Sequence, residues 1–419
     1  MRRNTVLLTL ALVACSSRAP HRLVDRPRPK PLARALDAGR IVRVVLATAD
    51  RRVSAAGDFD FYDEETGTRI GHGQRGETWR LERERAGVRV RAVAIEGGTT
   101  AWTRAMSVTS AAILSIGLKK YRGRFVVLPV DSGLMVVNHL RVEDYLRGVV
   151  PLEIGKLAQR DSAAMQAQAV AARSYAYVRL ADPIPRAFDL RPTTSDQVYG
   201  GFTAETEVAN DAIDATRGMV VMYQGRVVDA PFSSTCGGST ADAAEVWNGP
   251  GSPYLKRVSD QIGTTARYYC DQSARFRWTK TLSASELNAT LAQYLRNYAS
   301  VPASGPGATR AVNVQNRGGS GRVAVIQIET DRGTFPVRGD DIRSVLRPPS
   351  GEPLSSTYFS LAPEYDREGL LSSVTIRGQG YGHGVGLCQW GAIGRARAGQ
   401  SFLEILGTYY PGTTVGPIH

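Results

Sequence analysis

Histidine and cysteine are scarce in this sequence, which has five His and four Cys among its 419 residues. A tetrahedral structural zinc ion needs four nitrogen or sulfur ligands, supplied at short loop spacings. The stretch around Cys236 offers one Cys and no His. We therefore expect no metal site and no cofactor.

The small number of cysteines also limits disulfides and thiol chemistry. Beyond Cys15 the chain has Cys236, Cys270 and Cys388, and an odd count in an oxidising compartment predicts one disulfide and one free thiol. Cys236–Cys270 is the preferred pair, because Cys270 lies in an aromatic-rich stretch that can loop back. A cysteine nucleophile is the alternative, and it would need His383 to raise its thiolate fraction.

The N-terminal apolar run, residues 6–14, is too short to span a bilayer as a helix. It follows Arg2 and Arg3 and ends in small residues before Cys15, a pattern that resembles a secretory signal with a bacterial lipobox. We expect residues 1–15 to be a lipoprotein signal peptide and Cys15 to carry the lipid anchor. An ordinary signal with an incidental Cys is the alternative. Ser16, in place of Asp, favours the outer membrane, with the protein facing the periplasm.

Composition divides the rest of the chain into three parts. Residues 16–39 are rich in Pro and Arg and cannot bury a core, so they are interpreted as a semi-extended tether. Residues 40–118 carry short β-branched runs between Gly, Asp and Asn, which predicts a strand-rich segment. Residues 119–419 mix strand and helix patterns without a repeat. The expected fold class is α+β, with a single elaborated domain.

The stretch from 145 to 180 is the most informative. Pro151 breaks an apolar segment, and a lone carboxylate, Glu153, follows two residues later. A helix then begins, which Asp161 or Ser162 can cap through a short side-chain oxygen, and Ala residues at three- and four-residue spacing give it a closely packing stripe. A carboxylate on a turn beside a rigid helix suits proton transfer. The ordinary interpretation is a solvated surface Glu.

Five sequence blocks stand out, and the first two lie within this stretch. They are VVPLEIG (149–155), AMQAQAVAARSYAY (164–177), TTSDQVYGG (193–201), SSTCGGSTADAAEVW (233–247) and the glycine-rich block that begins GQGYGHGVGLCQWGAIG at residue 378. Together they resemble the stage II sporulation protein D (SpoIID/LytB) family, in the expected order and over roughly two thirds of the chain.

The resemblance implies that Glu153 is the general acid of a lytic transglycosylase that acts on peptidoglycan glycan strands. Ordinary glycoside hydrolysis needs two carboxylates, whereas here the 6-hydroxyl of the sugar would attack and leave a 1,6-anhydro-muramyl end. Val149, Val150 and Leu152 should raise the pKa of Glu153 by burying it. Asp144 or Glu143 remains open as a second carboxylate.

Matched polar and glycine positions are expected to bind the glycan. They are Gln168, Arg173, Tyr175, Gln197, Tyr199, Cys236, Gly237, Gly238, His383 and Gln389. The Gly237–Gly238 pair allows close approach of a ligand, and glycines at every second position from 378 to 386 would leave a bare groove floor. They do not fit the G-x-G-x-x-G dinucleotide fingerprint. For His383 a structural role, bonded to backbone, is the alternative.

Charge gives a further indication, because 52 Lys and Arg face 39 Asp and Glu, a formal charge of +13. A basic exported protein is attracted to anionic wall polymer or lipid, and export argues against nucleic acid. Two other functions stay open: a glycan-binding modifier that stimulates an N-acetylmuramoyl-L-alanine amidase, and a purely structural envelope lipoprotein. The motifs fix neither a role in sporulation or division nor a need for peptide-stripped glycan.

Overall fold

The computed structural model describes residues 39–182, 186–247, 249–348 and 351–418. The expected signal peptide, Cys15 and nearly all of the tether lie outside the described residues. Helices and strands alternate through several sheets, which confirms the α+β class. In the part of the chain that the structure describes, no helix is both long and apolar enough to cross a membrane.

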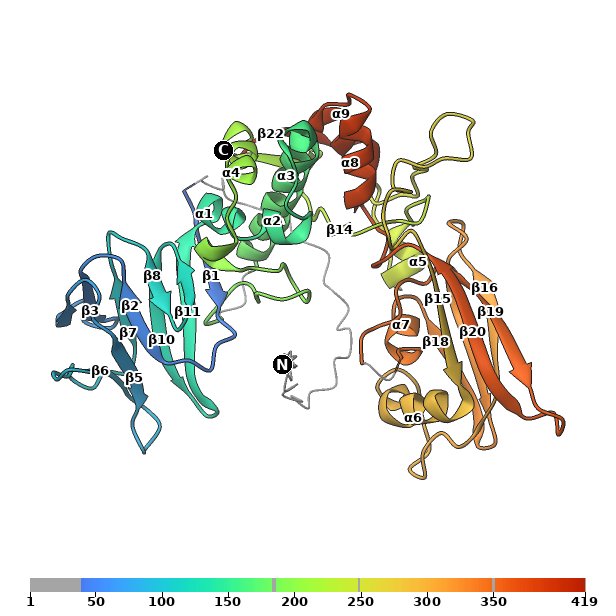
Figure 1. Cartoon of the computed structure of the whole chain (residues 1–419), viewed down its shortest axis with the longest axis horizontal. Helices are drawn as coiled ribbons and strands as arrows, with labels where there is room; N and C mark the ends of the chain where they lie inside the picture. Colours follow the sequence, from blue (N-terminus) through green and yellow to red (C-terminus); the bar gives the residue numbers. More distant parts are fainter. Residues whose placement is uncertain (1–38, 183–185, 248, 349–350, 419) are drawn as a thin grey trace, which may run out of the picture.

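Two antiparallel sheets form the N-terminal part (Figure 1). One has six strands in the order β1-β11-β10-β7-β3-β4, and the other has five in the order β6-β5-β2-β8-β9. Alternate apolar side chains of these strands are buried between them, as the period of two in a pleated strand requires. The strands are β1 Ile41–Val45, β2 Arg52–Ala55, β3 Phe59–Asp63, β4 Arg69–Gly73, β5 Trp79–Arg83, β6 Val90–Ala94, β7 Met106–Thr109, β8 Leu114–Ile116, β9 Lys119–Tyr121, β10 Arg124–Val130 and β11 Gly133–Arg141.

The boundary expected between residues 118 and 119 does not divide the structure. It falls inside the β8–β9 hairpin, where Ile116 pairs with Lys119. β10 pairs with β7, and β11 pairs with β1, so residues 119–141 complete the sheets begun by residues 40–118. The strand-rich part therefore extends to Arg141, because each half supplies hydrogen-bond partners that the other needs.

A helical layer follows the sheets and encloses the long helix α3. Fourteen of its 19 residues are buried, from all sides, because its many Ala side chains let neighbouring elements approach closely. Asp161 precedes α3 but does not cap it through its side chain; the carboxylate accepts from Arg397 Nε instead, at 2.8 Å. The elements are α1 Val142–Arg147, α2 Val150–Glu153, α3 Ser162–Leu180, α4 Glu207–Ala215, β12 Met219–Tyr223, β13 Arg226–Val227, α8 Gln389–Arg397, α9 Phe402–Tyr409 and β22 Thr414–Pro417.

A second unit lies on the other side of the helical layer from the N-terminal sheets (Figure 1). It consists of two three-stranded sheets, β15-β20-β19 and β16-β17-β18, and has a hydrophobic core of its own. The sequence predicted a single elaborated domain, but this part of the chain packs as a unit with its own core. Its elements are β15 Arg277–Ser283, α6 Ala284–Tyr294, β16 Thr309–Arg317, β17 Val323–Thr330, β18 Gly333–Arg338, α7 Asp341–Val345, β19 Phe359–Tyr365 and β20 Leu371–Gln379.

The chain enters and leaves this unit through one crossing. β14 (Phe232–Ser233) on the way in runs parallel to β21 (Leu387–Cys388) on the way out, and Thr235 bridges Tyr381 beside them. The short helix α5 (Ala243–Trp247) follows β14. Segments about 150 residues apart in the sequence thus form one joint, which the sequence patterns did not predict.

The alternating glycines from 378 to 386 lie at this joint, and their bare face is covered by the protein itself. A Cβ atom on Gly380 would lie 2.8 Å from Thr235 O, and one on Gly386 would lie 2.1 Å from Pro231 O. Both glycines have positive φ. The expected groove floor for a polymer is therefore wrong: the glycines allow two backbone segments to pack against each other.

Candidate functional site

Glu153 is the last residue of α2, a single turn that begins at Val150 and has Pro151 in its first turn. Gly155 then turns the chain at φ +94°. Val149 and Val150 are buried as expected, but Leu152 is 41% exposed. Proline fixes the start of the turn and glycine ends it, so the position of Glu153 is set by its local sequence.

Within the described part of the chain, the carboxylate of Glu153 has a single hydrogen-bond donor, the backbone N–H of Val198, at 2.6 Å from Oε1. Burial raises the pKa of Glu153 to about 7, and the Val198 hydrogen bond lowers it by less. The residue nevertheless keeps part of its surface in solvent. A partly exposed carboxyl with a pKa near neutrality can both donate and accept a proton, as general acid–base chemistry requires.

The loop that carries Val198 also holds Asp196, which contacts Tyr175, one of the matched polar side chains. Tyr175 Oη, on α3, donates to Asp196 Oδ1 at 3.0 Å, and Arg191 N–H donates to Asp196 Oδ2 at 3.0 Å. Glu153, Asp196 and Tyr175 all influence the pKa of buried Tyr145, which places them in one neighbourhood. Sequence reasoning missed the N–H of Val198, because an apolar side chain gives no signal for a backbone donor.

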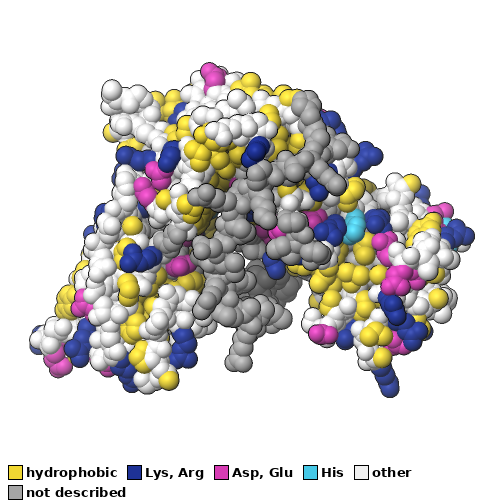
Figure 2. All heavy atoms as spheres, turned by 180° about the vertical axis from the view of Figure 1, so that it is seen from behind, with side chains coloured by type: hydrophobic (Ala, Val, Ile, Leu, Met, Phe, Trp, Pro, Cys, Tyr) yellow, Lys and Arg dark blue, Asp and Glu magenta, His cyan; other side chains and the backbone are white. Residues whose placement is uncertain are grey.

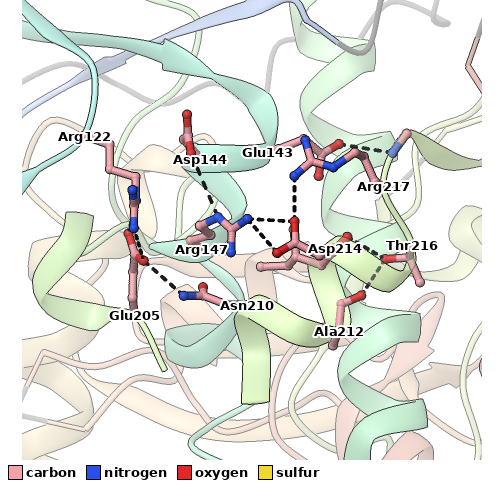
Figure 3. Close-up of polar contacts among 12 residues, drawn as sticks. Arg122, Glu143, Asp144, Arg147, Glu205, Asn210, Ala212, Asp214, Thr216 and Arg217 are labelled. Atoms are coloured by element: carbon pink, nitrogen blue, oxygen red, sulfur yellow. Dashed lines mark hydrogen bonds and ion pairs between the residues drawn. The ribbon is translucent and has the colours of Figure 1, made fainter. Parts of the chain in front are cut away.

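Neither Glu143 nor Asp144 is free to serve as the second carboxylate. Glu143 is buried and accepts from Arg173 Nε and Nη2 at 2.9 and 2.8 Å. Asp144 lies 3.9 Å from Arg147, whose guanidinium also pairs with Asp214 at 2.7 Å (Figure 3). Both carboxylates of α1 are therefore held in ion pairs, and α1 offers no base for hydrolysis.

Three of the side chains expected to bind glycan are structural instead. Arg173 is fully buried, and beyond Glu143 it donates to Met219 O at 3.0 Å. Gln197 is fully buried too; its amide accepts from Tyr145 Oη at 3.0 Å and donates to Ala172 O at 3.3 Å. Tyr199 Oη donates to Asn138 Oδ1 at 2.7 Å. Their polar atoms already have partners inside the protein, so a sugar cannot reach them.

Gln168 and Gln389 join two helices. Gln389 Nε2 donates to Gln168 Oε1 at 3.3 Å, which connects α3 to the start of α8. Both side chains are buried. Gln168 Nε2 has no hydrogen-bond partner among the described residues. The pair packs the helical layer, and the expectation that both bind glycan is not supported by their burial.

Gly237 and Gly238 pack against protein rather than against an open surface. A Cβ atom on Gly237 would lie 2.8 Å from Gly380 N, and one on Gly238 would lie 3.0 Å from the ring of Tyr268. Both have positive φ. The pair that was expected to leave room for a ligand packs instead against the backbone at Gly380 and the ring of Tyr268.

His383 has the structural role that was the alternative to substrate binding. Val385 N–H donates to His383 Nδ1 at 3.1 Å, so the other ring nitrogen, Nε2, carries the proton and donates to Phe232 O at 2.9 Å. Burial lowers the pKa of His383 to about 4, which keeps the ring neutral. With both nitrogens bonded to backbone, His383 cannot activate a cysteine nucleophile.

The three cysteines that the structure describes are free, buried thiols. Cys236 and Cys270, the expected disulfide pair, are brought together with their sulfurs 3.6 Å apart but without a bond. Cys388 and Asp260 join them, and the four possible ligand atoms lie within 4.8 Å of one another. The expectation of no metal counted ligands within one stretch. It loses its basis, because the fold gathers them from four segments.

Comparisons with known proteins identify the class and then the family. Residues 130–223 match the family described as "Stage II sporulation protein", and residues 262–386 match a domain of unknown function, DUF8618. The second match covers the separately packed unit. The first covers the Glu153 turn, α3 and the Val198 loop.

Three curated relatives cover most of the chain. An uncharacterized protein of Brachyspira hyodysenteriae is 33% identical over 71% of this chain and 72% of its own length. Stage II sporulation protein D of Bacillus subtilis is 30% identical over 72% of this chain and 82% of its own. The Bacillus subtilis amidase enhancer is 30% identical over 64% of this chain but only 40% of its own. The chain belongs to the stage II sporulation protein D family.

Proposed function

We propose that this protein remodels the bacterial cell wall by cleaving peptidoglycan glycan strands as a lytic transglycosylase, with Glu153 as its single acid and base. The kinship with stage II sporulation protein D and with the amidase enhancer supports the cell-wall role. The environment of Glu153 supports the particular reaction. The observation that carries the proposal is the partly exposed carboxyl whose pKa burial raises to about 7.

The reaction needs no water and no second carboxylate. Protonated Glu153 gives its proton to the glycosidic oxygen while the bond from that oxygen to C1 of the muramic acid breaks. The C6 hydroxyl of the same sugar then bonds to C1 and returns its proton to the Glu153 carboxylate. The products are a shortened strand and a 1,6-anhydro-muramyl end, and the enzyme regains its starting protonation state.

The contacts of Glu153 fit both halves of this cycle. The N–H of Val198 holds Oε1, so Oε2 is the oxygen that would carry the proton. In the second half the same N–H would stabilise the carboxylate that must take the proton back. Because Glu143 and Asp144 are committed to arginines, the arrangement favours transglycosylation over two-carboxylate hydrolysis.

The test is mass spectrometry of intact and peptide-stripped peptidoglycan after treatment with the protein or with Glu153→Gln. Anhydro-muramyl products should appear with the wild type and fall by at least 100-fold with the variant. Glu207→Gln is a matched control, because it removes an exposed carboxylate of the same helical layer and should keep full activity. Reducing ends in place of anhydro ends would refute the mechanism.

A second candidate function is the stimulation of an amidase without cleavage of glycan. The observation in its favour is the similarity to the amidase enhancer, of which the chain spans about 40%. Amidase turnover on purified peptidoglycan, with and without the protein, distinguishes the two. Equal stimulation by wild type and Glu153→Gln, with no anhydro product from either, would favour the modifier.

We further propose that the protein is exported and anchored by lipid at Cys15, on the outer membrane and facing the periplasm. The basic residues before the apolar run and the small residues before Cys15 support this. Figure 2 shows Lys and Arg side chains spread over the visible face of the protein rather than gathered in one patch. Such a surface suits diffuse attraction to anionic wall polymer.

A further inference from the structure

We propose that Cys236, Asp260, Cys270 and Cys388 bind one zinc ion, which fixes the joint between the helical layer and the second unit. Nothing in the proposed reaction at Glu153 uses these residues, so the two proposals stand or fall separately. The four possible ligand atoms lie within 4.8 Å of one another and all four residues are buried.

The distances suit a tetrahedral thiolate site. Two sulfurs bound at about 2.3 Å to a tetrahedral ion lie roughly 3.8 Å apart, and the sulfurs of Cys236 and Cys270 are 3.6 Å apart. The Oδ2 atom of Asp260 is 3.2 Å from the sulfur of Cys236. Three sulfurs and one carboxylate oxygen form a ligand set that favours zinc, because thiolate selects soft or borderline ions.

The surroundings orient the ligands as an outer shell does in metal sites. Asp260 Oδ1 accepts from Tyr409 Oη at 2.6 Å and from Arg395 Nη2 at 3.0 Å, which leaves Oδ2 turned to the sulfurs. Cys388 Sγ accepts two backbone N–H groups, from Cys236 at 3.2 Å and from Gly391 at 3.3 Å. Paired N–H donors are expected around a thiolate, since a neutral thiol is a weak acceptor.

A disulfide explains this cluster less well. A Cys236–Cys270 bond would draw the sulfurs to about 2.05 Å and leave Cys388 beside them unused. It would also remove the S–H that Cys236 donates to Asp260 Oδ2. That would leave a buried carboxylate oxygen without its partner, which is costly. Zinc gives all four groups a partner at once.

The positions of the ligands indicate what the ion would do. Cys236 follows β14, on the way into the second unit, and Cys388 ends β21, on the way out and at the start of α8. Asp260 and Cys270 come from the loops that lead to β15. One ion would therefore join the entering and leaving segments to α8, and metal binding would stabilise the joint.

The experiment measures metal in the full chain carrying Cys15→Ser, which removes the one cysteine outside the cluster. After purification in reducing buffer with Zn²⁺, native mass spectrometry should find one zinc per chain. Asp260→Asn should weaken zinc binding at least tenfold. Asp271→Asn is the matched control, because Asp271 is adjacent to Cys270 but pairs with Arg267 at the surface, and it should bind zinc as the parent does.

A second measurement needs no ligand variant and so does not depend on whether such variants fold. Co²⁺ exchanged into the Cys15→Ser chain should give the sulfur-to-cobalt charge-transfer absorption and the intense visible bands of a tetrahedral thiolate site. A chain that takes up neither ion overturns the proposal. It would then show either three alkylatable thiols or a Cys236–Cys270 disulfide with one thiol, as peptide mapping would reveal.

Discussion

At the scale of single residues, Glu153 differs from three other carboxylates of the helical layer, because no cation among the described residues pairs with it. Glu143 pairs with Arg173, Asp214 with Arg147 and Arg217, and Asp161 with Arg397. A carboxylate beside an arginine keeps its charge, whereas one held among apolar groups with a single N–H donor keeps its proton. Burial raises the pKa of Glu153, and no cation among the described residues opposes that rise, which sets Glu153 apart as an acid.

The raised pKa of Glu153 predicts how its replacement changes stability with pH. The folded-state pKa is about 7, above the 4.5 expected of an unfolded chain. Between these values the unfolded state has lost the proton and the folded state keeps it, so this group makes wild-type stability fall as pH rises. Above pH 7 the folded protein holds a poorly solvated charge. Glu153→Gln should therefore raise the free energy of unfolding by ~1–3 kcal/mol at pH 8.5.

Urea unfolding at pH 4.5 and 8.5 measures this effect. The gain from Glu153→Gln should vanish at pH 4.5, where wild-type Glu153 is protonated in the folded state. Glu207→Gln, at an exposed position, should change stability equally little at both values. A gain that is the same at both pH values would show that the substitution acts by packing and not through ionisation.

The buried Arg173–Glu143 pair predicts a loss of folding rather than a loss of binding. Glu143→Gln leaves the fully buried guanidinium of Arg173 without its carboxylate. Breaking a buried pair in this way costs roughly 3–5 kcal/mol. Thermal unfolding should show the loss directly, and glycan sedimentation by the remaining folded protein should be unchanged. If the variant instead kept full thermal stability but sedimented less with glycan, the result would indicate that Arg173 helps to bind the substrate.

The sequence predicted the raised pKa of Glu153 better than the roles of the residues around it. Burial raises its pKa as expected, although Leu152, one of the three residues expected to bury it, is itself 41% exposed. Gln197, Arg173 and His383 were recognised as special but were assigned to substrate. A motif identifies residues that are constrained, but it does not say whether a polar group faces solvent or satisfies a buried partner. That choice depends on contacts such as Tyr145–Gln197, 52 residues apart.

At the scale of elements, local signals predicted local structure. A capping box, Ser283 with Glu286, opens α6, and the β12–β13 hairpin turns at Gln224, which has φ +51°. The helix expected from residue 162 is α3, although Asp161 bonds Arg397 and does not cap it. The pairing of β14 with β21 could not be predicted from the sequence, because strands of two residues show no periodicity and the two strands lie far apart along the chain.

The glycine run at this pairing predicts a position-dependent cost for added methyl groups. Gly386→Ala places a Cβ atom 2.1 Å from Pro231 O, a backbone atom that cannot move aside, at φ +71°. Strain and overpacking together should cost roughly 2–5 kcal/mol. Gly399→Ala is the control: its φ is +87° and nothing lies within 4 Å, so only the ~1–2 kcal/mol of left-handed strain remains. Equal losses in thermal unfolding would mean that Gly386 is needed for its φ alone.

At the scale of the whole molecule, the residues that the structure describes form two hydrophobic cores that share no residue. One combines the N-terminal sheets with the helical layer, and the other belongs to the unit from β15 to β20. The sequence patterns did not reveal this division, because both parts mix strands with helices. The domain matches fall on either side of it, with residues 130–223 in the first part and 262–386 spanning the second.

Two separate cores predict two unfolding transitions in calorimetry of the full chain, each governed by its own packing. Ile328→Ala removes a fully buried side chain from β17 in the second core, and Ile405→Ala removes the same side chain from α9 in the first. Each should cost about 2–5 kcal/mol. Because the lost contacts stay within one core, each variant should lower one transition and leave the other in place. Two variants that lower a single shared transition alike would instead show that the joint at β14 and β21 couples the cores into one cooperative unit.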